Sequence, residues 1–277
     1  MNSLAVVILT HNEEKNLPDC LASVRTLGCP VFVVDSGSTD GTLGIAQAAG
    51  AATAQHPFEN YAAQRNWAQS QLPWAVEWIL HLDADERLTP ELAREVAGVL
   101  ANPAPGVDGY LAKRRTVFMG RWIKHGGHYP VYHLRLFRRE KGRCENRRYD
   151  QHFMVNGATA RLEHDFIDIV ASGLGPWTQR HARWAEQEAR EMSEGETAGA
   201  DQVAPSLWNG PIARRRWLRN RVYARFPLFL RPAGYWLYRY VFRLGFLDGR
   251  EGLVFHFLQG FWFRFLVDSM VFEQRHV

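Results

Sequence analysis

The hydrophobic pattern of the first hundred residues alternates between short apolar runs and segments of helical periodicity. The run at 4–9 is rich in β-branched residues and suits a strand buried on both faces of a parallel sheet. Further strands are predicted at 30–35, 51–55 and 78–82. The helical segments cover 16–27, 42–49, 62–71 and 90–100. The last of these has Thr89 as a suitable N-cap and Pro90 at its first position. This rhythm predicts an α/β fold with a doubly wound, mostly parallel open sheet flanked by helices.

The pattern changes twice in the rest of the chain. Shorter alternation across 109–139 indicates β structure, and 178–192 is a predicted charged helix with Thr178 as its N-cap. Toward the C-terminus Arg, Trp, Phe, Leu and Tyr dominate, and acidic residues become rare. We therefore expect one domain at 1–204 and a basic, aromatic, helical region at 205–277.

Composition narrows the choice of partners. A net charge of +4 and a pI near 9.1 favour anionic partners, which include nucleotide phosphates, anionic lipids and nucleic acid. No apolar run near 20 residues lacks a charge, so the sequence predicts no membrane span. Cys20, Cys29 and Cys144 lack metal-ligand spacing and indicate reduced thiols in a cytosolic compartment.

Two polar motifs follow predicted strands, where ligands bind in open α/β sheets. In LTHNEE at 9–14, the ring of His11 can stack on a base and Glu13 can meet ribose hydroxyls. The alternative is a polar turn in which Asn12 caps the next helix. In VVDSGSTDGT at 33–42, Asp35 can accept a hydrogen bond from a base N–H, whereas Asp40 suits a capping role.

A third motif, DADE at 83–86, follows the apolar run WILHL. Two carboxylates at i and i+2 beyond a buried strand can share one cation and a diphosphate. Mg²⁺ and Mn²⁺ prefer such oxygen ligands and leave coordination places for phosphate oxygens. The cation would neutralise the charge that builds up on a leaving diphosphate. The alternative is a pair of acids that only solvate a loop.

Taken in order, THNEE at 10–14, VDSGSTDGT at 34–42, QRN at 64–66 and LDADE at 82–86 resemble glycosyltransferase family 2. These are inverting enzymes with the GT-A fold. Segments 135–152 and 239–268 resemble the branch that adds sugars to lipopolysaccharide core or related surface polysaccharides. The resemblance implies transfer of a sugar from a nucleotide-diphosphate sugar, with UDP favoured, to a lipid-linked or polysaccharide acceptor. It also implies help from Mn²⁺ or Mg²⁺.

The resemblance also assigns roles to individual residues. It implies that Asp35 reads the base, that Arg65 lies near the base or the diphosphate, and that Asp83 contacts the ribose side. It implies that Asp85 binds the metal. The rest of the expected nucleotide-sugar site consists of Thr10, His11, Glu13 and Ala84.

The acceptor-side base departs from the family pattern. Family members often carry an acid within Val-His-Glu or Glu-Asp, whereas this chain has YDQH at 149–152. An inverting transfer needs a carboxylate to take the acceptor hydroxyl proton, and Gln151 has no titratable group. Asp150 is therefore the candidate base, and His152 is an alternative metal ligand or phosphate contact. A structural pair between Asp150 and Arg147 or Arg148 is the competing interpretation, which would leave the two acids Glu145 and Asp165 to test.

The C-terminal region indicates contact with lipid. Six arginines crowd 214–225, where Leu218, Val222 and Phe226 recur at i+4 and predict an amphipathic helix on an anionic membrane surface. The more apolar segments 226–247 and 253–272 are interrupted by arginines, which favours helices lying in the interface over spanning ones. We expect a peripheral protein on the cytoplasmic face of the bacterial inner membrane. Packing on the catalytic domain or a dimer contact is the alternative.

Two other functions fit parts of the sequence. A nucleotidyltransferase acting on a sugar phosphate also presents paired acids, but such enzymes carry a Gly-rich basic N-terminal loop that LTHNEE lacks. An RNA-binding or lipid-binding protein would use the arginine-rich segment. Against RNA, acids cluster at the predicted cleft and would repel a phosphate backbone, so we expect no nucleic-acid partner. The loop HGGHYP at 125–130 either lines the acceptor cleft or is a plain loop.

Overall fold

The computed structural model describes residues 3–147, 149–194, 202–208 and 210–276, and these form two compact units. Unit 1 comprises Met1–Arg115, Val131–Glu145 and Gln151–Ala171. Unit 2 comprises Thr116–Pro130, Asn146–Asp150 and Ser172–Val277. Because each unit draws on several chain segments, the division expected at residue 205 stays a prediction.

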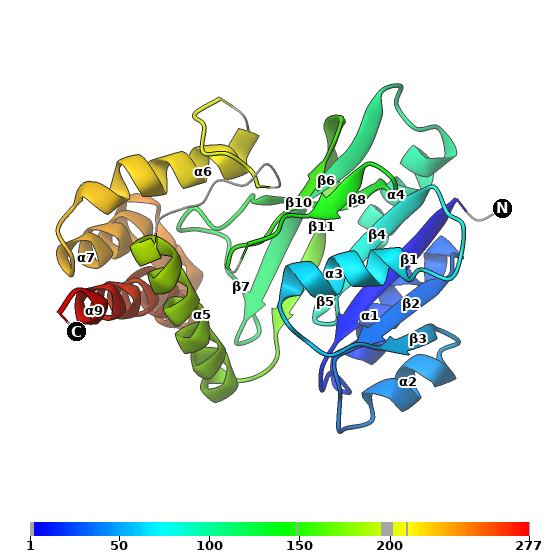
Figure 1. Cartoon of the computed structure of the whole chain (residues 1–277), viewed down its shortest axis with the longest axis horizontal. Coiled ribbons are helices and arrows are strands. Elements are labelled where there is room, and N and C mark those ends of the chain that lie inside the picture. Colours follow the sequence, from blue (N-terminus) through cyan, green and yellow to red (C-terminus); the bar gives the residue numbers. More distant parts are fainter. Residues whose placement is uncertain (1–2, 148, 195–201, 209, 277) are drawn as a thin grey trace. The chain divides into compact units, whose positions relative to one another are not determined.

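Unit 1 is built on one large mixed sheet (Figure 1). Its strands are β1 (Leu4–Thr10), β2 (Val31–Asp35), β3 (Ala52–Gln55), β4 (Trp78–Asp83), β5 (Glu86–Leu88), β6 (Val107–Phe118), β8 (Tyr132–Arg138) and β11 (Ala158–Val170). Their order is β3-β2-β1-β4-β8-β6-β11-β5. A separate two-stranded sheet pairs β9 (Gly142–Cys144) with β10 (Phe153–Val155).

The α/β prediction is confirmed, and the parallel pairing is confined to one half of the sheet. Strands β3, β2, β1 and β4 run parallel, as the apolar runs in the first hundred residues predict. The pairs β4–β8, β6–β8 and β5–β11 are antiparallel. Parallel neighbours need a crossover connection, usually a helix. Between residues 102 and 170, the described part of the chain forms no helix that could make such a crossover, which agrees with the antiparallel pairing of β6 with β8.

Helices cover both faces of the parallel half. They are α1 (Leu17–Val24), which runs on into the short η1 (Arg25–Leu27), α2 (Thr42–Ala48), α3 (Tyr61–Ser70) and α4 (Pro90–Ala101). In β1, Val6 and Ile8 join the core under α1, α2 and α4, whereas Val7 joins the core under α3. Burial on both faces explains why the sequence of β1 is continuously apolar instead of alternating. The predicted cap of α4 is confirmed, since Thr89 Oγ1 accepts the N–H of Leu92 at 3.2 Å.

Unit 2 is mainly helical. Its helices are α5 (Leu174–Glu194), α6 (Gly210–Arg221), α7 (Leu230–Leu237), α8 (Gly249–His256) and α9 (Phe263–His276). Shorter elements are β7 (Arg121–Trp122), η2 (Tyr223–Arg225), η3 (Tyr238–Phe242), η4 (Gly245–Asp248) and η5 (Phe257–Trp262). The small side chains of Ala185 and Ala189 let α5 pack closely on Phe263 and Val267 of α9.

Two predictions for these helices are wrong. Thr178 is not an N-cap: α5 begins at Leu174, and the Thr178 hydroxyl donates to the Leu174 carbonyl at 2.9 Å. The basic amphipathic stripe does not lie on one helix, because α6 ends at Arg221, before Val222 and Phe226. The arginines also do not all face solvent, since Arg216 is buried and donates to two backbone carbonyls.

The HGGHYP loop packs within unit 2. His125 Nδ1 lies 2.6 Å from Asp248 Oδ1, and the His125 N–H donates to Asp248 Oδ2 at 2.9 Å. A Cβ on Gly126 would lie 2.1 Å from the ring of His256, so only glycine fits there. These contacts support the plain-loop interpretation of this segment.

The packing of β9 generates a stability prediction. A Cβ on Gly142 would lie 2.2 Å from Cδ2 of Phe137, whose ring is fully buried and has no room to move. Gly142→Ala is therefore expected to lower the free energy of unfolding by about 1 to 3 kcal/mol. Gly98→Ala is the matched control, because no atom lies within 4 Å of its Cβ position in α4. It should leave stability unchanged or raise it by up to about 1 kcal/mol. Urea unfolding measures both, and equal effects would contradict the packing described here.

Candidate functional site

The carboxyl ends of three neighbouring strands bring the sequence motifs together. Thr10 at the end of β1 pairs in register with Asp35 at the end of β2. On the other side of β1, Leu9 pairs in register with Asp83 at the end of β4. The prediction that these motifs meet at one edge of the sheet is therefore confirmed.

Asp35 is fully buried and holds the loop that follows it. Its carboxylate accepts hydrogen bonds from Thr10 Oγ1 at 3.0 Å, Gly37 N at 2.9 Å, Ser38 N at 2.8 Å and the Ser38 hydroxyl. Burial would raise the pKa of Asp35, but the hydrogen bonds from Ser38 and Thr10 outweigh it and hold the pKa below its ordinary value. The group is therefore ionised at neutral pH.

Asn12 joins the first motif to the second. Its backbone N–H donates to Ser38 Oγ at 2.8 Å, and its side-chain oxygen accepts the N–H of Thr39 at 2.8 Å. Asn12 adopts the left-handed conformation, with φ at 57°, which asparagine tolerates better than most residues. The interpretation of Asn12 as a helix cap is wrong, because Asn16 occupies the N-cap position of α1.

Of the other residues in the first two motifs, some are exposed to solvent and others are held by hydrogen bonds. His11 is exposed, whereas Glu13 is half-buried and accepts a hydrogen bond from Asn16 Nδ2 at 2.7 Å. The N–H of Glu13 donates to Thr42 Oγ1 at 2.8 Å. Asp40 accepts the N–H of Thr42, the first residue of α2, at 3.0 Å, although Gly41 and not Asp40 occupies the N-cap position.

Asp83 is shared by two buried arginines. Arg65 of α3 lies 3.1 Å from both carboxylate oxygens, and Arg135 of β8 lies 3.2 Å from Oδ2. Arg135 also forms an ion pair with Glu86. Burial would raise the pKa of Asp83, but the two guanidinium groups reverse this and hold it well below its ordinary value.

The turn after β4 is held from inside the protein. Glu86 Oε2 accepts the N–H of Asp83 at 3.0 Å, and Cys20 Sγ lies 3.7 Å from the Asp83 carbonyl. The methyl group of Ala84 is buried in the core, so only its backbone is available to a ligand. Burial raises the pKa of Glu86 to about 7, although the guanidinium of Arg135 opposes the rise.

Asp85 has the opposite electrostatic environment to Asp83. Its backbone carbonyl accepts the N–H of Ile169 at 3.0 Å, and its half-buried carboxylate lies near other acids. Burial, followed by the charges of Asp168 and Asp83, raises the pKa of Asp85 well above its ordinary value. No cationic side chain among the described residues forms an ion pair with Asp85. A carboxylate with an excess of neighbouring negative charge suits a divalent cation.

The described residues contain no group of three or more His, Cys, Asp or Glu side chains arranged to hold a metal ion. A cation at Asp85 would therefore take much of its coordination from elsewhere. Mg²⁺ sites with one or two carboxylates, completed by substrate phosphates and water, fit such a donor set. The residues present thus fit a cation that binds together with a diphosphate.

The QRN motif fixes α3 to its surroundings. Gln64 Nε2 donates to Ser36 Oγ at 3.1 Å, in the loop after β2. Asn66 forms two hydrogen bonds with the backbone of Cys144 in β9, at 2.9 Å and 2.8 Å. Arg65 lies between them in the sequence, so both of its neighbours help to hold its side chain against the end of β4.

Asp150, the candidate base, belongs to unit 2. Its φ is 54°, and its carbonyl accepts a hydrogen bond from Arg216 at 2.9 Å. Of the proposed structural partners, Arg147 forms a buried ion pair with Glu191. Arg148 lies outside the described residues. The role of Asp150 as a base stays a prediction.

The other acids considered for this role are occupied. Glu145 is fully buried and accepts the backbone N–H of His152 at 2.8 Å. Asp165 is buried and accepts a hydrogen bond from Arg115 at 2.8 Å. The ring of His152 lies 6.3 Å from that of His133, and the part of the chain that is described places His152 in no metal-holding group.

Three site residues were not predicted from the sequence. The sequence does contain an indication that Arg135 has a buried partner, because it is a lone cation inside the apolar run LRLF at 134–137. Glu86 stands in the DADE motif and was given no role. No feature of the sequence indicates a role for Asp168, because it lies opposite Glu86 only through the antiparallel register of β11 with β5.

Residues 5–163 match the family model of glycosyl transferase family 2, which is more than half of the chain. The matched segment contains Thr10, Asp35, Arg65, Asp83 and Asp85. The chain belongs to glycosyltransferase family 2. Its strand-end carboxylates and Arg65 form the candidate site of unit 1.

Relatives within the family match part of the chain. An uncharacterized glycosyltransferase of Rickettsia typhi is 36% identical over 112 residues, which are 40% of this chain and 37% of the relative. The lipopolysaccharide core biosynthesis glycosyltransferase LpsC of Rhizobium meliloti is 34% identical over 147 residues, which are 51% of this chain and 53% of LpsC. The chain therefore spans less than two thirds of the length of either relative.

Solved structures give weaker likenesses. TarS of S. aureus (residues 1–349) aligns with 99% of this chain and 91% of its own, at 15% identity and a TM-score of 0.47. Glucosyl-3-phosphoglycerate synthase of Mycobacterium tuberculosis, in complex with Mn²⁺, UDP and glucosyl-3-phosphoglycerate, covers 41% of this chain and 44% of its own. That alignment has 23% identity and a TM-score of 0.35. Both TM-scores are below 0.5, so family membership rests on the matched sequence.

The raised pKa of Glu86 generates a pH prediction. Its pKa in the folded protein is about 7, whereas the ordinary pKa of this side chain is 4.5, so the free energy of unfolding falls as the pH rises between these values. Glutamine does not titrate. Relative to the wild type, Glu86→Gln should therefore gain stability between about pH 5 and about pH 8. Urea unfolding across this range, with the exposed Glu91→Gln as control, measures the difference. If the free energies of unfolding of Glu86→Gln and the wild type changed with pH in parallel, the raised pKa of Glu86 would be ruled out.

Proposed function

We propose that the protein is an inverting glycosyltransferase that moves a sugar from a UDP-sugar to a lipid-linked, lipopolysaccharide-core or surface-polysaccharide acceptor. The observation that carries the proposal is the pairing of Asp83 and Asp85 at the end of β4. One carboxylate is neutralised by two arginines, and the other has no described cationic partner. Both lie within the segment that matches the family.

In this proposal the nucleoside lies over the ends of β1 and β2. The ring of His11 stacks on the base and Glu13 hydrogen-bonds the ribose, with the Thr10 hydroxyl beside them. Asp35 accepts the base N–H in place of one of its present loop donors. The exposure of His11 and the polar donors around Asp35 support this arrangement.

The diphosphate lies between Arg65 and Asp85. A divalent cation, Mn²⁺ or Mg²⁺, supplies counter-charge for the leaving diphosphate when it is bound. Arg65 adds a fixed positive charge, and the solvent-facing part of Asp83 is available to a ribose hydroxyl. Ala84 contributes backbone only. The excess of acids around Asp85 supports a cation at this position.

The transfer itself needs one proton acceptor. The acceptor hydroxyl oxygen attacks the anomeric carbon as the bond from that carbon to the diphosphate oxygen breaks. The electron pair of that bond leaves with the nucleoside diphosphate, and the configuration at the anomeric carbon inverts. We propose that the carboxylate of Asp150 takes the hydroxyl proton.

The acceptor class and the place of action are also proposals. The name of the relative LpsC, a lipopolysaccharide core biosynthesis glycosyltransferase, supports an acceptor of that kind. Such acceptors are anchored in lipid, which is consistent with action at the cytoplasmic face of a bacterial inner membrane. Family membership favours this function over a nucleotidyltransferase or an RNA-binding protein.

The metal proposal predicts the effect of one substitution. Asp85→Ala should reduce sugar transfer by at least about 100-fold, because the leaving diphosphate loses its counter-charge. EDTA should have the same effect on the wild type. Glu91→Ala removes an exposed acid of α4 and is the control that should keep wild-type activity. Full turnover in EDTA, or by a folded Asp85→Ala, would overturn the metal-assisted mechanism.

The base proposal predicts a loss of rate without a loss of binding. Asp150→Asn should lower the transfer rate by a factor of about 100 to 10,000, with nucleotide-sugar binding unchanged. Asparagine is the right replacement because it also tolerates the left-handed φ of 54° at this position. The exposed Glu140→Gln is the control.

A purely structural Asp150 gives a different result. It predicts a lower melting temperature and only a modest loss of rate in the protein that stays folded. Measuring melting and rate on the same Asp150→Asn sample separates the two cases. A stable variant with nearly full activity would remove Asp150 from the mechanism.

A further inference from the structure

The outer side of unit 2 exposes large apolar side chains along two helical rods. One rod is α7 with its continuation η3, and it exposes Leu230, Leu237 and Val241. The other is α8, η5 and α9, and it exposes Leu253, Phe257 and Phe265. We call these six residues the apolar face. Leu230 alone is 68% exposed, which is far from the usual state of a leucine in a folded protein.

The exposed residues of each rod fall on one side of it. Leu230, Leu237 and Val241 recur at intervals of seven and four, which is helical spacing. In the second rod, which contains the π-helical segment η5, the ring of Phe261 lies 5.4 Å from that of Phe257 and 5.6 Å from that of Phe265, so these rings follow one another along one side. Each rod therefore presents an apolar stripe, and not scattered single residues.

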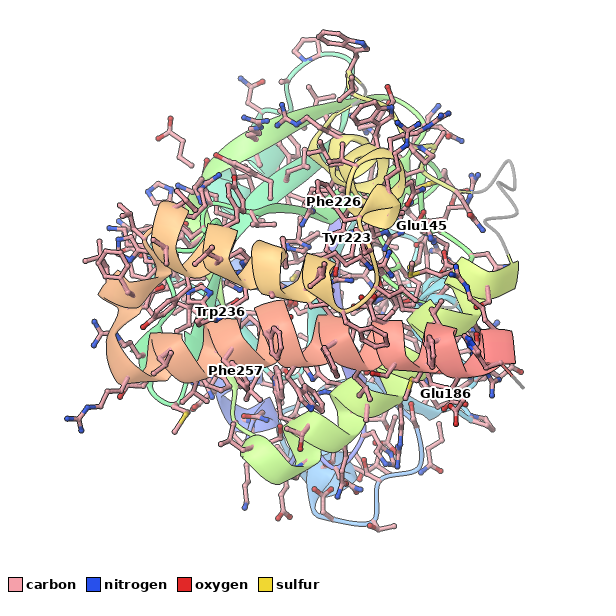
Figure 2. The ribbon with its side chains drawn as sticks, turned by 90° about the vertical axis from the view of Figure 1, so that its left-hand side faces the viewer. Glu145, Glu186, Tyr223, Phe226, Trp236 and Phe257 are labelled. Atoms are coloured by element: carbon pink, nitrogen blue, oxygen red, sulfur yellow. The ribbon has the colours of Figure 1, made fainter. Side chains whose placement is uncertain are left out.

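Ring contacts place the two rods side by side. Phe229, just before α7, lies 5.3 Å from the ring of Phe265 and 5.7 Å from that of Phe272. Trp236 of α7 lies 6.5 Å from Phe257. Figure 2 looks onto this side of unit 2, where the rods run next to each other with Trp236 and Phe257 labelled. The two stripes therefore form one continuous surface.

The opposite sides of the rods already have partners. Phe263 and Val267 of α9 are buried against α5. Arg231 of α7 and Asp268 of α9 form a buried ion pair, with Arg231 Nε 2.8 Å from Asp268 Oδ1. These contacts fix the orientation of both rods. The apolar face therefore stays exposed, because the opposite sides of the rods already pack within unit 2.

The charge around the apolar face is mainly positive, although Glu273 of α9 is an exposed carboxylate. Residues 210–272 contain 11 arginines, no lysine and only three carboxylates, Asp248, Glu251 and Asp268. Asp248 and Asp268 are buried, and Glu251 is half-buried 3.9 Å from Arg121. The exposed arginines on and next to the two rods are Arg221, Arg225, Arg243 and Arg250. An apolar surface bordered by arginines is complementary to a bilayer that contains anionic lipid.

The helices do not suit a spanning arrangement. In the described part of the chain, none is both long enough and apolar enough to cross a membrane. Helices that lie in the plane of the interface and bury one apolar side need neither property.

We propose that the apolar face is a membrane-docking surface that inserts at the boundary between headgroups and acyl chains of an anionic bilayer. The sequence predicts lipid contact for the arginine-rich segment 214–225 and for interfacial helices in 226–247 and 253–272. The proposal places the main contact on α7, α8 and α9, with exposed arginines such as Arg225 at its border. The inference does not depend on sugar transfer, because vesicles alone test it.

The test is co-flotation of the full chain with vesicles of phosphatidylglycerol and phosphatidylcholine, and with vesicles of phosphatidylcholine alone. Point substitutions are preferable to removal of 205–277, which would leave Ala185 and Ala189 of α5 without α9. Leu230→Glu and Phe257→Glu are expected to lower partitioning onto the anionic vesicles by at least about tenfold each. Leu230 is 68% exposed, so Leu230→Glu should not change the melting temperature. Phe257→Glu also removes the ring contact with Trp236, so its flotation is compared in protein that circular dichroism shows to be folded.

Two controls separate the contributions. Phe58→Glu adds the same charge at a phenylalanine of unit 1 that is 49% exposed, and it should float like the wild type. Replacing Arg225 and Arg243 by Gln should weaken binding to anionic vesicles by about fivefold per arginine. It should leave the weaker binding to phosphatidylcholine unchanged.

Three results would overturn the proposal. One is wild-type flotation by folded Leu230→Glu and Phe257→Glu. Another is an equal loss of flotation in Phe58→Glu, which would make added charge the cause. The third is a protein that ignores vesicles and forms a dimer that Leu230→Glu dissociates, as measured by light scattering. In that case the apolar face would be the contact between two copies.

Discussion

The carboxylate of Asp83, held between Arg65 and Arg135, is the interaction on which the candidate site depends. The two guanidinium groups come from α3 and β8, and Asp83 ends β4, so one shared ion pair joins three elements of unit 1. All three side chains are largely removed from water. Loss of one partner from such a buried group leaves an uncompensated charge, which typically costs about 3 to 5 kcal/mol.

The same interaction divides the DADE motif into two chemical environments. Asp83 is neutralised by arginines and its pKa is lowered, whereas Asp85, two residues later, lies among acids and its pKa is raised. Titratable neighbours whose pKa values move in opposite directions are typical of groups with different roles. Here Asp83 is held by ion pairs with Arg65 and Arg135, whereas no described cationic side chain forms an ion pair with Asp85. Glu86, beneath them, holds the turn that keeps the two apart.

The parallel half of the fold and its strand-end residues could be predicted from the sequence because both depend on local signals. The apolar runs define β1, β2 and β4, and strand order brings Thr10, Asp35 and Asp83 to one edge. The antiparallel half was harder to predict. Its strands are long, mixed in polarity and paired through distant residues, so register is not readable from spacing. Arg135 and Asp168 were missed for this reason, because each reaches the site only through that pairing.

The C-terminal region shows the same limit in another form. Composition indicated contact with lipid for the whole region, and periodicity predicted one amphipathic helix in the segment with the most arginines. The structure does not contain this helix. Arg216 is buried and donates to two backbone carbonyl groups, and α6 ends before Phe226. The apolar stripe of α8 and α9 was also hidden in the sequence, because η5 changes the helical period within it.

The central claim is that the end of β4 binds a nucleoside diphosphate through a divalent cation at Asp85. Calorimetric titration of UDP into the wild type and Asp85→Ala, with Mn²⁺ and with EDTA, tests it most directly. The account predicts that Mn²⁺ tightens UDP binding to the wild type by at least about tenfold, and that Asp85→Ala loses this gain while staying folded. UDP affinity that is the same with Mn²⁺ and with EDTA, or the same in both proteins, would contradict it.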